Sequence, residues 1–426
     1  MLLEATIGNC LSYNHPQTFS LVASNANEHE HSNVAAVQAA NKHRLLRTAV
    51  IYGPNASGKS NLLHGLLAMR NIIVQSAASQ RGDALPVTPF KLDHQKRHAP
   101  TEFEVVFIAE NVRYQYGFTA TKDKVHEEWL FAFPKGQAQT WFQRAWDEEQ
   151  QDYEWNFGSN LQGEKAVWRR STRNNALFLS TAVQLNSLQL QPVFDWFSNT
   201  LKFIGVDKIP SKYTAMKVHK GGKAEVLNYL NSVGINLADI AVTEVPVSEA
   251  LPPDMPAKLR ERIAQDLKNQ VHLDVKVQRL DDQNKPIDFS FETEESEGTQ
   301  RFFSLVGPWI DVLEQGAVLF VDELNNSLHT NLVLFLLKLF NNPVTNPKNA
   351  QLVFTTHDTN QLNKNVLRRD QIWFCEKNSA QATELYALSD FKVRKGREDF
   401  ERAYLSGRFG ALPFIKEFGV ADEREE

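Results

Sequence analysis

Residues 45–67 read LLRTAVIYGPNASGKSNLLHGLL, and this stretch decides the fold of the chain. An apolar run at 48–52 leads directly into a glycine-bounded loop at 53–60, and leucines at helical spacing follow. The loop matches the pattern G-x-x-x-x-G-K-[ST] at every fixed position and stands between a predicted strand and a predicted helix, as the pattern requires. The stretch therefore predicts a phosphate-binding loop; the alternative is a glycine turn before an ordinary helix.

Each residue type in this loop has a chemical reason. Gly53 and Gly58 allow backbone angles and close approaches that a Cβ atom would prevent. Backbone N–H groups at the start of the new helix attract a phosphate anion, Lys59 adds a positive charge, and the Ser60 hydroxyl is placed to bind Mg²⁺. The residues expected to hold the nucleotide are Gly53, Pro54, Asn55, Ala56, Ser57, Gly58, Lys59, Ser60 and Asn61.

The composition is that of an ordinary folded protein. The chain has 426 residues and a formal net charge of -5, so bulk charge gives no reason to expect non-specific binding to nucleic acid. Its two cysteines, Cys10 and Cys375, fit a reducing compartment rather than a disulfide scaffold. The first residues have the features of neither a secretory signal nor a membrane span, and we therefore expect a cytoplasmic protein without membrane contact.

Alternating apolar and polar residues predict antiparallel strands in the first third of the chain. The predicted strands lie within 2–21, broken by a turn at 14–16, and at 102–108, 112–118, 127–133 and 139–144. Three histidines, His29, His31 and His43, lie in or just after the polar segment 24–42. Because no carboxylate or cysteine ligand set accompanies them, a solvated loop is a better prediction than a metal site.

Helical patterns dominate the middle of the chain. They include 192–203, 224–233 and 256–269, and a further hairpin is predicted at 271–278 and 287–291. The lysine-rich segment 208–223 is predicted to be a mobile loop, with a phosphate-backbone contact as the alternative. No heptad pattern persists, so no long coiled-coil arm is expected. The expected domains are an N-terminal lobe at 1–160, a helical insertion at 161–270, a C-terminal lobe at 271–390 and a tail at 391–426.

Two later apolar runs end in polar residues. Residues 316–323 end in Asp322 and Glu323, and residues 350–357 end in His357. Continuous apolar runs are typical of strands buried in a parallel sheet, and ligands bind at the carboxyl ends of such strands. Asp322 is therefore predicted to bind Mg²⁺, Glu323 to activate water, and His357 to contact phosphate or water.

A third motif precedes the acidic run. Ser296 and Gly298 stand before a helical pattern in the sequence SEGTQR. Such a helix start is an anion-binding end, although by itself it is no more than an N-cap.

The order of these motifs resembles that of ATP-binding-cassette ATPases. Several segments resemble those of bacterial AAA-family ATP-binding proteins of the abortive-infection class, which include RloA-like, AriA-like and overcoming-lysogenization-related ATPases. These segments are GPNASGKSNLL, ALFLS, DELNNSLH, FTTHDTNQL and YLSGRFGALPFI. The resemblance implies an α/β fold of the ABC-ATPase P-loop type, with a mixed sheet, an antiparallel β subdomain and a helical insertion. It also implies ATP and Mg²⁺ as ligands and hydrolysis of ATP.

The resemblance assigns further roles. Ser296 and Gly298 would form the signature element that closes over ATP bound to a second copy of the chain, so a homodimer or higher oligomer is implied, with residues 326–329 at its interface. Asn325 stands where the family often has aspartate, and Phe90 and Lys91 lie near the expected place of a switch glutamine. A separately encoded effector, often a TOPRIM-type nuclease, and a phage protein trigger are the implied partners.

Three functional hypotheses follow. The first is an ATP-hydrolysing switch of an anti-phage system that controls the effector. The second is a DNA-associated repair or restriction ATPase, and the third is a scaffold in which ATP is only a structural ligand. Lys392, Arg394, Lys395 and Arg397 form a basic cluster, for which a solvated face is favoured over an effector or nucleic-acid contact.

Overall fold

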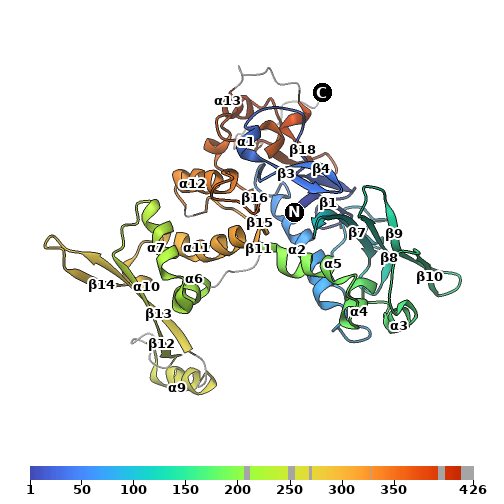
Figure 1. Ribbon diagram of the computed structural model, residues 1–426, viewed down its shortest axis with the longest axis horizontal. Coiled ribbons are helices and arrows are strands. Elements are labelled where there is room, and N and C mark those ends of the chain that lie inside the picture. The colour runs from blue at the N-terminus through green and yellow to red at the C-terminus, as the bar shows by residue number, and fades with distance from the viewer. Residues whose placement is uncertain (206–211, 248–254, 268–270, 327, 392–398, 414–426) are drawn as a thin grey trace, which may run out of the picture. The chain divides into compact units, whose positions relative to one another are not determined.

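The apolar run before the phosphate loop forms the centre of a mixed sheet. Figure 1 shows the computed structural model. Strand β5 (Thr48–Tyr52) lies between β16 (Gln351–Thr355) and β17 (Ile372–Lys377). The described part of this sheet has the order β11-β15-β16-β5-β17-β18. Its first five strands are parallel and the last is antiparallel. Every residue of β5, β15 and β16 is buried, as expected for parallel strands that are covered on both faces.

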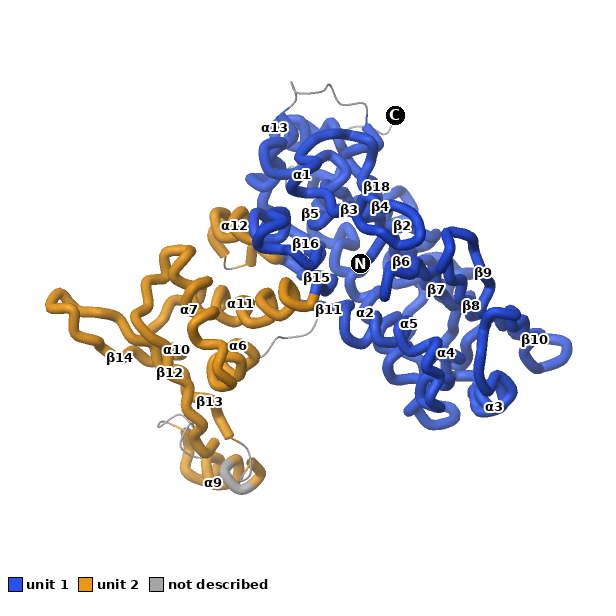
Figure 2. The backbone as a smooth tube through the Cα atoms, in the orientation of Figure 1, with its two compact units in different colours: residues 1–206, 316–323, 337–426 blue, residues 207–315, 324–336 orange. Residues whose placement is uncertain are grey.

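The structure describes residues 1–205, 212–247, 255–267, 271–326, 328–391 and 399–413. The chain forms two compact units, coloured in Figure 2: residues 1–206, 316–323 and 337–426 belong to the first, and residues 207–315 and 324–336 to the second. This division follows compactness and does not reproduce the four domains expected from the sequence. The four domains predicted from the sequence, at 1–160, 161–270, 271–390 and 391–426, stay predictions.

An antiparallel sheet forms the other large element of the first unit. Its order is β10-β9-β8-β7-β6-β1-β2 in the described residues. The strands predicted from alternation are confirmed: β1 (Leu2–Gly8), β2 (Gln17–Ser20), β6 (Thr101–Ala109), β7 (Val112–Ala120), β8 (Val125–Phe133) and β9 (Gln139–Asp147), with β10 (Asp152–Phe157) in addition. The fold is thus a P-loop α/β fold with a mixed sheet and an antiparallel β subdomain.

Helices of the first unit pack on these sheets. They are α2 (Lys59–Gln75), α3 (Lys165–Ser171), α4 (Phe178–Gln184), α5 (Gln191–Asp195) and a π-helix (Trp196–Thr200). The predicted helix at 192–203 is wrong at its end, because Leu201–Ile204 forms β11. This strand pairs in parallel with β15 (Val318–Val321), and such a long-range pairing overrides local helical preference.

A buried ion pair joins the antiparallel sheet to α4. The Glu128 and Arg144 side chains are fully buried and lie 2.8 Å apart. The Glu128 carboxylate also accepts hydrogen bonds from the backbone N–H groups of Phe178 and Leu179, at 2.7 and 3.0 Å. A buried charge is tolerated when it is paired and hydrogen-bonded in this way, so these contacts fix the start of α4 on the sheet.

The prediction of a solvated loop at 24–42 is wrong. The segment contains α1 (Glu30–Asn33) and β3 (Val34–Ala39), and β3 pairs with β4 (Asn41–Leu46) as a hairpin. Its charges have specific partners: the Glu30 carboxylate pairs with Arg44, and the buried Arg368 guanidinium donates to the Ala26 carbonyl at 2.9 Å. Polar composition therefore reflects pairing within the fold here, rather than solvation.

The second unit contains a three-stranded sheet and several helices. The predicted hairpin is confirmed as β13 (Val271–Leu280) and β14 (Pro286–Ser290), and β12 (Asp239–Pro246) adds an unpredicted strand. Helices α7 (Lys223–Ser232) and α9 (Ala257–Asp266) agree with the sequence patterns. The other described helices are α6 (Lys212–Lys217), a π-helix (Val218–Gly222), α10 (Phe291–Glu294) and α11 (Glu297–Gln315).

The lysine-rich segment 208–223 is not a loop from residue 212 onward, where the structure describes it. Its lysines include Lys217, which lies 2.7 Å from Asp311 of α11. The Thr214 hydroxyl is fully buried and accepts a hydrogen bond from the Gly307 N–H at 3.0 Å. Contacts with α11 therefore stabilise helical structure in this segment. Its lysine content alone had favoured a loop.

The last part of the chain completes the first unit. It comprises α12 (Thr330–Asn341), whose residues divide between the two units, β17, β18 (Thr383–Ala387) and α13 (Phe400–Leu405). The basic cluster predicted at Lys392, Arg394, Lys395 and Arg397 lies outside the described residues. None of the helices in the described ranges has the length and apolar character needed to cross a membrane.

Candidate nucleotide-binding site

The phosphate loop connects β5 to α2, as the sequence predicts, and its two glycines are required by their surroundings. Gly53 has φ +152° and Gly58 has φ +111°, both on the side of the Ramachandran map that favours glycine. A Cβ atom at Gly53 would lie 2.2 Å from the carbonyl oxygen of Cys375, and one at Gly58 would lie 2.1 Å from the Thr383 hydroxyl oxygen. Neither position has room for a side chain.

Residues far away in the sequence hold the loop in place. The Tyr13 hydroxyl donates to the Gly58 carbonyl at 3.0 Å, and the Thr383 hydroxyl donates to the Ser57 carbonyl at 2.7 Å. The Asn61 side-chain amide donates to the Ser12 hydroxyl at 2.8 Å. Sequence reasoning missed Ser12, Tyr13 and Thr383, because only the pairing of distant strands brings them to the loop and no local motif marks them.

Lys59 is folded back onto the loop. Its ammonium group donates to the carbonyl oxygens of Gly53 and Pro54, at 2.8 and 3.0 Å, and the residue is only 5% exposed. Burial lowers the pKa of Lys59, while the negative charges of Asp322 and Glu323 oppose that shift. The carboxylates at the tip of β15 therefore act electrostatically on the lysine of the phosphate loop.

The loop fits a phosphate group by two further observations. The Ser57 hydroxyl is buried and has no hydrogen-bond partner among the described residues. Within the described part of the chain, the Lys59 ammonium donates hydrogen bonds to carbonyl oxygens of its own loop alone. A phosphate would be a stronger acceptor because it is charged. Backbone N–H groups at the start of α2 would add to such a contact. The residues present therefore suit a polyphosphate.

The acidic pair lies at the tip of β15 and is held by the neighbouring strand. The fully buried Thr355 hydroxyl, at the end of β16, donates to the Asp322 carboxylate at 2.6 Å and accepts from the Glu323 N–H at 2.8 Å. Glu323 has φ +48°, a left-handed conformation that is uncommon for a residue with a side chain. Thr355 thus fixes both the Asp322 carboxylate and the backbone that orients Glu323.

His357 joins this group from the strand between β15 and β5. Its Nε2 atom lies 3.7 Å from a Glu323 carboxylate oxygen, and about one third of its side chain is exposed. Burial and the nearby Lys59 charge lower the pKa of His357, against an opposing effect of Glu323. A lowered pKa favours the neutral imidazole, which can donate or accept a hydrogen bond. The structure thus brings Lys59, Asp322, Glu323 and His357 to one edge of the sheet.

A hollow of about 660 Å³ opens beside the loop, large enough for a small-molecule ligand. The lining includes Tyr52, Gly53, Pro54, Asn55, Ser57, Thr356, His357, Glu376, Lys377 and Tyr404. Glu376, Lys377 and Tyr404 were not expected there from the sequence. They come from β17 and α13, which reach the loop only through the order of strands in the sheet.

The remaining predicted site residues lie elsewhere. Ser296 and Gly298 belong to the second unit, where the Ser296 hydroxyl accepts from the Thr299 N–H at 3.2 Å at the start of α11. Asn325 and Asn326 also belong to that unit, and Ser327 lies outside the described residues. Their predicted roles across a second copy of the chain therefore stay predictions.

Phe90 and Lys91 lie near the expected place of a switch glutamine, and the position of that glutamine stays unassigned. Phe90 is only 2% exposed and its N–H donates to the Asn9 side chain at 3.1 Å. Lys91 lines a different pocket, which contains none of the phosphate-loop residues.

A family comparison agrees with this geometry. The profile of the family described as "AAA domain, putative AbiEii toxin, Type IV TA system" matches residues 49–199 and 233–363. These segments make up more than half of the chain and contain the phosphate loop, Asp322, Glu323 and His357. The chain belongs to this family. The prediction of an AAA-type ATP-binding protein is thereby confirmed at the level of the family.

The AAA-domain chain was also compared with solved structures and with curated proteins. Seventy-eight chains of solved structures match. One is the SMC head domain from Thermotoga maritima, with a TM-score of 0.40 and 10% sequence identity, which covers 91% of this chain and 98% of that chain. No curated protein matches the sequence.

Replacing Thr355 by valine should weaken the acidic site of this AAA domain without unfolding it. Valine fills similar space but cannot donate to Asp322 or accept from the Glu323 N–H, so the carboxylates lose their orientation. Loss of a hydrogen bond to a charged group costs about 1.5–3 kcal/mol, and we expect the Mg²⁺ concentration for half-maximal ATP turnover to rise about tenfold. Thr355→Ser keeps the hydroxyl and should behave as wild type; equal Mg²⁺ dependence in both variants would contradict the positioning role.

Proposed function

We propose that this protein is an ATP-hydrolysing molecular switch of a bacterial anti-phage defence system, acting in the cytoplasm. The observation that carries the proposal is the convergence of Lys59, Asp322, Glu323 and His357 beside the phosphate loop. A site that needed only to hold a nucleotide would not require a carboxylate oriented beside a histidine. The switch would sense infection and control a separately encoded effector.

Each residue of the site has a distinct role in the proposed hydrolysis of ATP. The loop amides and Lys59 bind and orient the triphosphate, and Ser60 and Asp322 would hold Mg²⁺, which neutralises phosphate charge when bound. Glu323 accepts a proton from the attacking water. The His357 Nε2 atom lies 3.7 Å from a carboxylate oxygen of Glu323, so His357 is close enough to orient the same water. The loop amides and the Lys59 ammonium are fixed where negative charge develops on the phosphate. Electrostatic stabilisation of this kind is usually the largest contribution to the acceleration of phosphoryl transfer.

Ser296 and Gly298 have a role in this proposal only if two copies of the chain meet. They would close over ATP bound to the phosphate loop of the second copy, so that ATP binding drives a homodimer or higher oligomer. Asn325 carries no charge where the resembled family often has aspartate, and coupling between two such sites would be weaker for that reason. ATP-dependent assembly is the measurable consequence.

The defence role rests on compatibility with the family. The family description names a putative AbiEii toxin and a type IV TA system, and both belong to two-component control of a toxic protein. The narrower assignment to the RloA-like, AriA-like and overcoming-lysogenization-related class is part of the proposal. An effector of the TOPRIM nuclease type and a phage protein as trigger complete it.

The proposal is tested in cells that carry the chain together with its neighbouring gene. Phage plaque formation should be reduced by the wild-type pair and restored when Lys59 is replaced by alanine, and ATP with Mg²⁺ should change the assembly of the purified chain. A pair that protects equally well with Lys59→Ala would contradict the switch. Hydrolysis that is stimulated by DNA at low salt, and lost at high salt, would favour a DNA-associated ATPase instead.

A further inference from the structure

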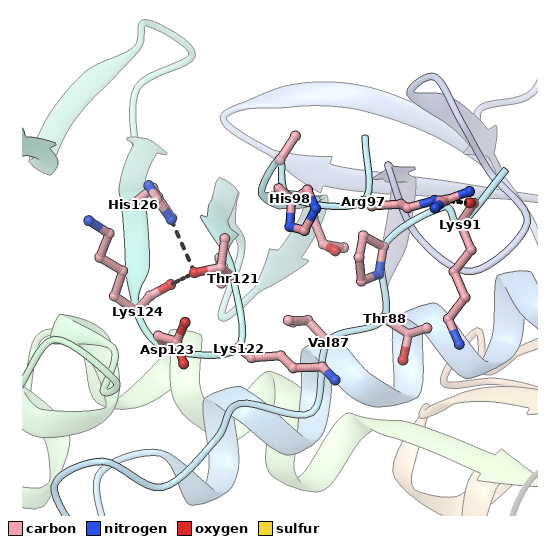
Figure 3. A pocket seen from close by; sticks show the side chains of 14 residues that line it. Val87, Thr88, Lys91, Arg97, His98, Thr121, Lys122, Asp123, Lys124 and His126 are labelled. Carbon is pink, nitrogen blue, oxygen red and sulfur yellow. Dashed lines mark hydrogen bonds between the residues drawn. The ribbon is translucent and has the colours of Figure 1, made fainter. Parts of the chain in front are cut away.

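A second pocket of the first unit has the chemistry of an anion site. It has a volume of about 540 Å³ and contains none of the residues around the phosphate loop. Figure 3 shows its lining side chains, which come from two walls: residues 87–101 and residues 120–126. The charged groups of the lining are Lys91, Arg97, Lys122 and Lys124, against a single carboxylate, Asp123.

Most of this positive charge is not neutralised by the protein. Lys124 forms an ion pair with Glu148 at 2.9 Å. Lys91, Arg97 and Lys122, in contrast, have no ion-pair partner among the residues that the structure describes. The chain as a whole is acidic, with a net charge of -5, so this local excess of cations does not follow from composition. Lys91, Arg97 and Lys122 are exposed, so water screens their mutual repulsion, and all three are available to pair with an anion.

The first wall is held in shape by a buried residue. Asn9 is 4% exposed, and its side-chain amide donates to the carbonyl oxygens of Lys96 and Ala99, both at 2.9 Å. The Arg97 guanidinium donates through Nε to the Lys91 carbonyl at 2.5 Å. That contact leaves the terminal nitrogens of Arg97 for a ligand. Preorganisation of this kind lowers the cost of binding.

The second wall is a tight turn between β7 and β8. The Thr121 N–H donates to the Lys124 carbonyl at 2.9 Å, and the Leu85 N–H donates to the Lys122 carbonyl at 2.8 Å. The Thr121 hydroxyl lies 3.2 Å from the His126 ring, as the dashed line in Figure 3 shows. Lys122 therefore stands on a fixed backbone opposite the wall that carries Lys91 and Arg97.

We propose that this basic pocket, lined by Lys91, Arg97, Lys122 and Lys124, binds a small molecule that carries two or more phosphate groups. Arginine and lysine are the side chains that recognise phosphate, by paired donors and by point charge respectively. The volume lies within the range of small-molecule sites, about 300–1,000 Å³. A single-stranded nucleic acid fits less well, because its sites are extended grooves with stacking aromatic residues, and the lining of this pocket includes no phenylalanine, tyrosine or tryptophan.

The pocket stands independently of the proposed ATPase, and the test separates the two. The probe is tripolyphosphate, measured by calorimetry on the full chain carrying Lys59→Ala, which weakens the phosphate loop as a competing site. Binding should remain in this background. Adding Arg97→Glu and Lys122→Glu should raise the dissociation constant at least about tenfold, because two attractive charges become repulsive.

The matched control places the same charge change elsewhere in the first unit. Lys42→Glu with Lys135→Glu reverses two exposed lysines that do not line the pocket, and tripolyphosphate binding should then stay within about twofold of the Lys59→Ala parent. Thermal unfolding checks that each variant is folded, and Lys122→Gln gives a milder version. Absence of tripolyphosphate binding, equal loss in the control, or binding of a short single-stranded DNA oligonucleotide in place of tripolyphosphate would each overturn the proposal.

Discussion

Replacement of Gly53 by alanine should abolish ATP binding while leaving the protein folded. The added Cβ atom would lie 2.2 Å from the carbonyl oxygen of Cys375 and 2.7 Å from the Ser57 hydroxyl. Because a backbone carbonyl of the central sheet cannot move aside, the phosphate loop must shift instead. A shift that breaks two hydrogen bonds to a charged phosphate costs about 3 kcal/mol or more. We therefore expect the dissociation constant for ATP–Mg²⁺ to rise at least about a hundredfold.

Gly82→Ala is the matched control for this change. Gly82 also has a positive φ, +89°, but nothing lies within 4 Å of a Cβ atom built there. The control therefore carries a comparable backbone strain without the collision. It should bind ATP as the wild type does, and both variants should unfold near the wild-type temperature. Normal ATP affinity in Gly53→Ala would show that the loop geometry described above is not the binding geometry.

Glu323→Gln should separate binding of ATP from its hydrolysis. Glutamine keeps the size and position of the side chain beside His357 but cannot take a proton from water. General base catalysis contributes roughly 10²- to 10⁴-fold, and we expect single-turnover hydrolysis to fall by that factor while ATP–Mg²⁺ binding is retained. ATP-dependent assembly should consequently persist longer than in the wild type.

Asp322→Asn provides the contrast to this variant. Its predicted partner is Mg²⁺, so its main effect should be a higher Mg²⁺ requirement, measured as the concentration for half-maximal ATP binding. If Glu323→Gln turned over ATP and protected cells as the wild type does, hydrolysis would be unnecessary. The chain would then act as a scaffold with ATP as a structural ligand.

The sequence predicted which residues meet beside the phosphate loop because its signals are local. The local signals are a glycine-rich loop between a strand and a helix, and apolar runs that end in Asp322, Glu323 and His357. They predict neighbouring positions because the carboxyl ends of parallel strands meet at one edge of the sheet. The loop prediction at 24–42 failed for the opposite reason. Its charged residues Glu28 and Glu30 pair with Arg44, Arg368 and Arg369. Two of these arginines stand more than three hundred residues away, and local composition cannot report such partners.

The sequence by itself determined the phosphate loop, the buried strands of the mixed sheet and the polar residues at their tips, because each depends on spacing along the chain. Only the tertiary structure decided which distant groups support them. These groups are Thr355 beside the carboxylates, Tyr13 and Thr383 against the loop, and the cations that line the two walls of the basic pocket. They come from segments that meet through strand order. Strand order is set by packing of the whole sheet, and no single stretch of residues contains it.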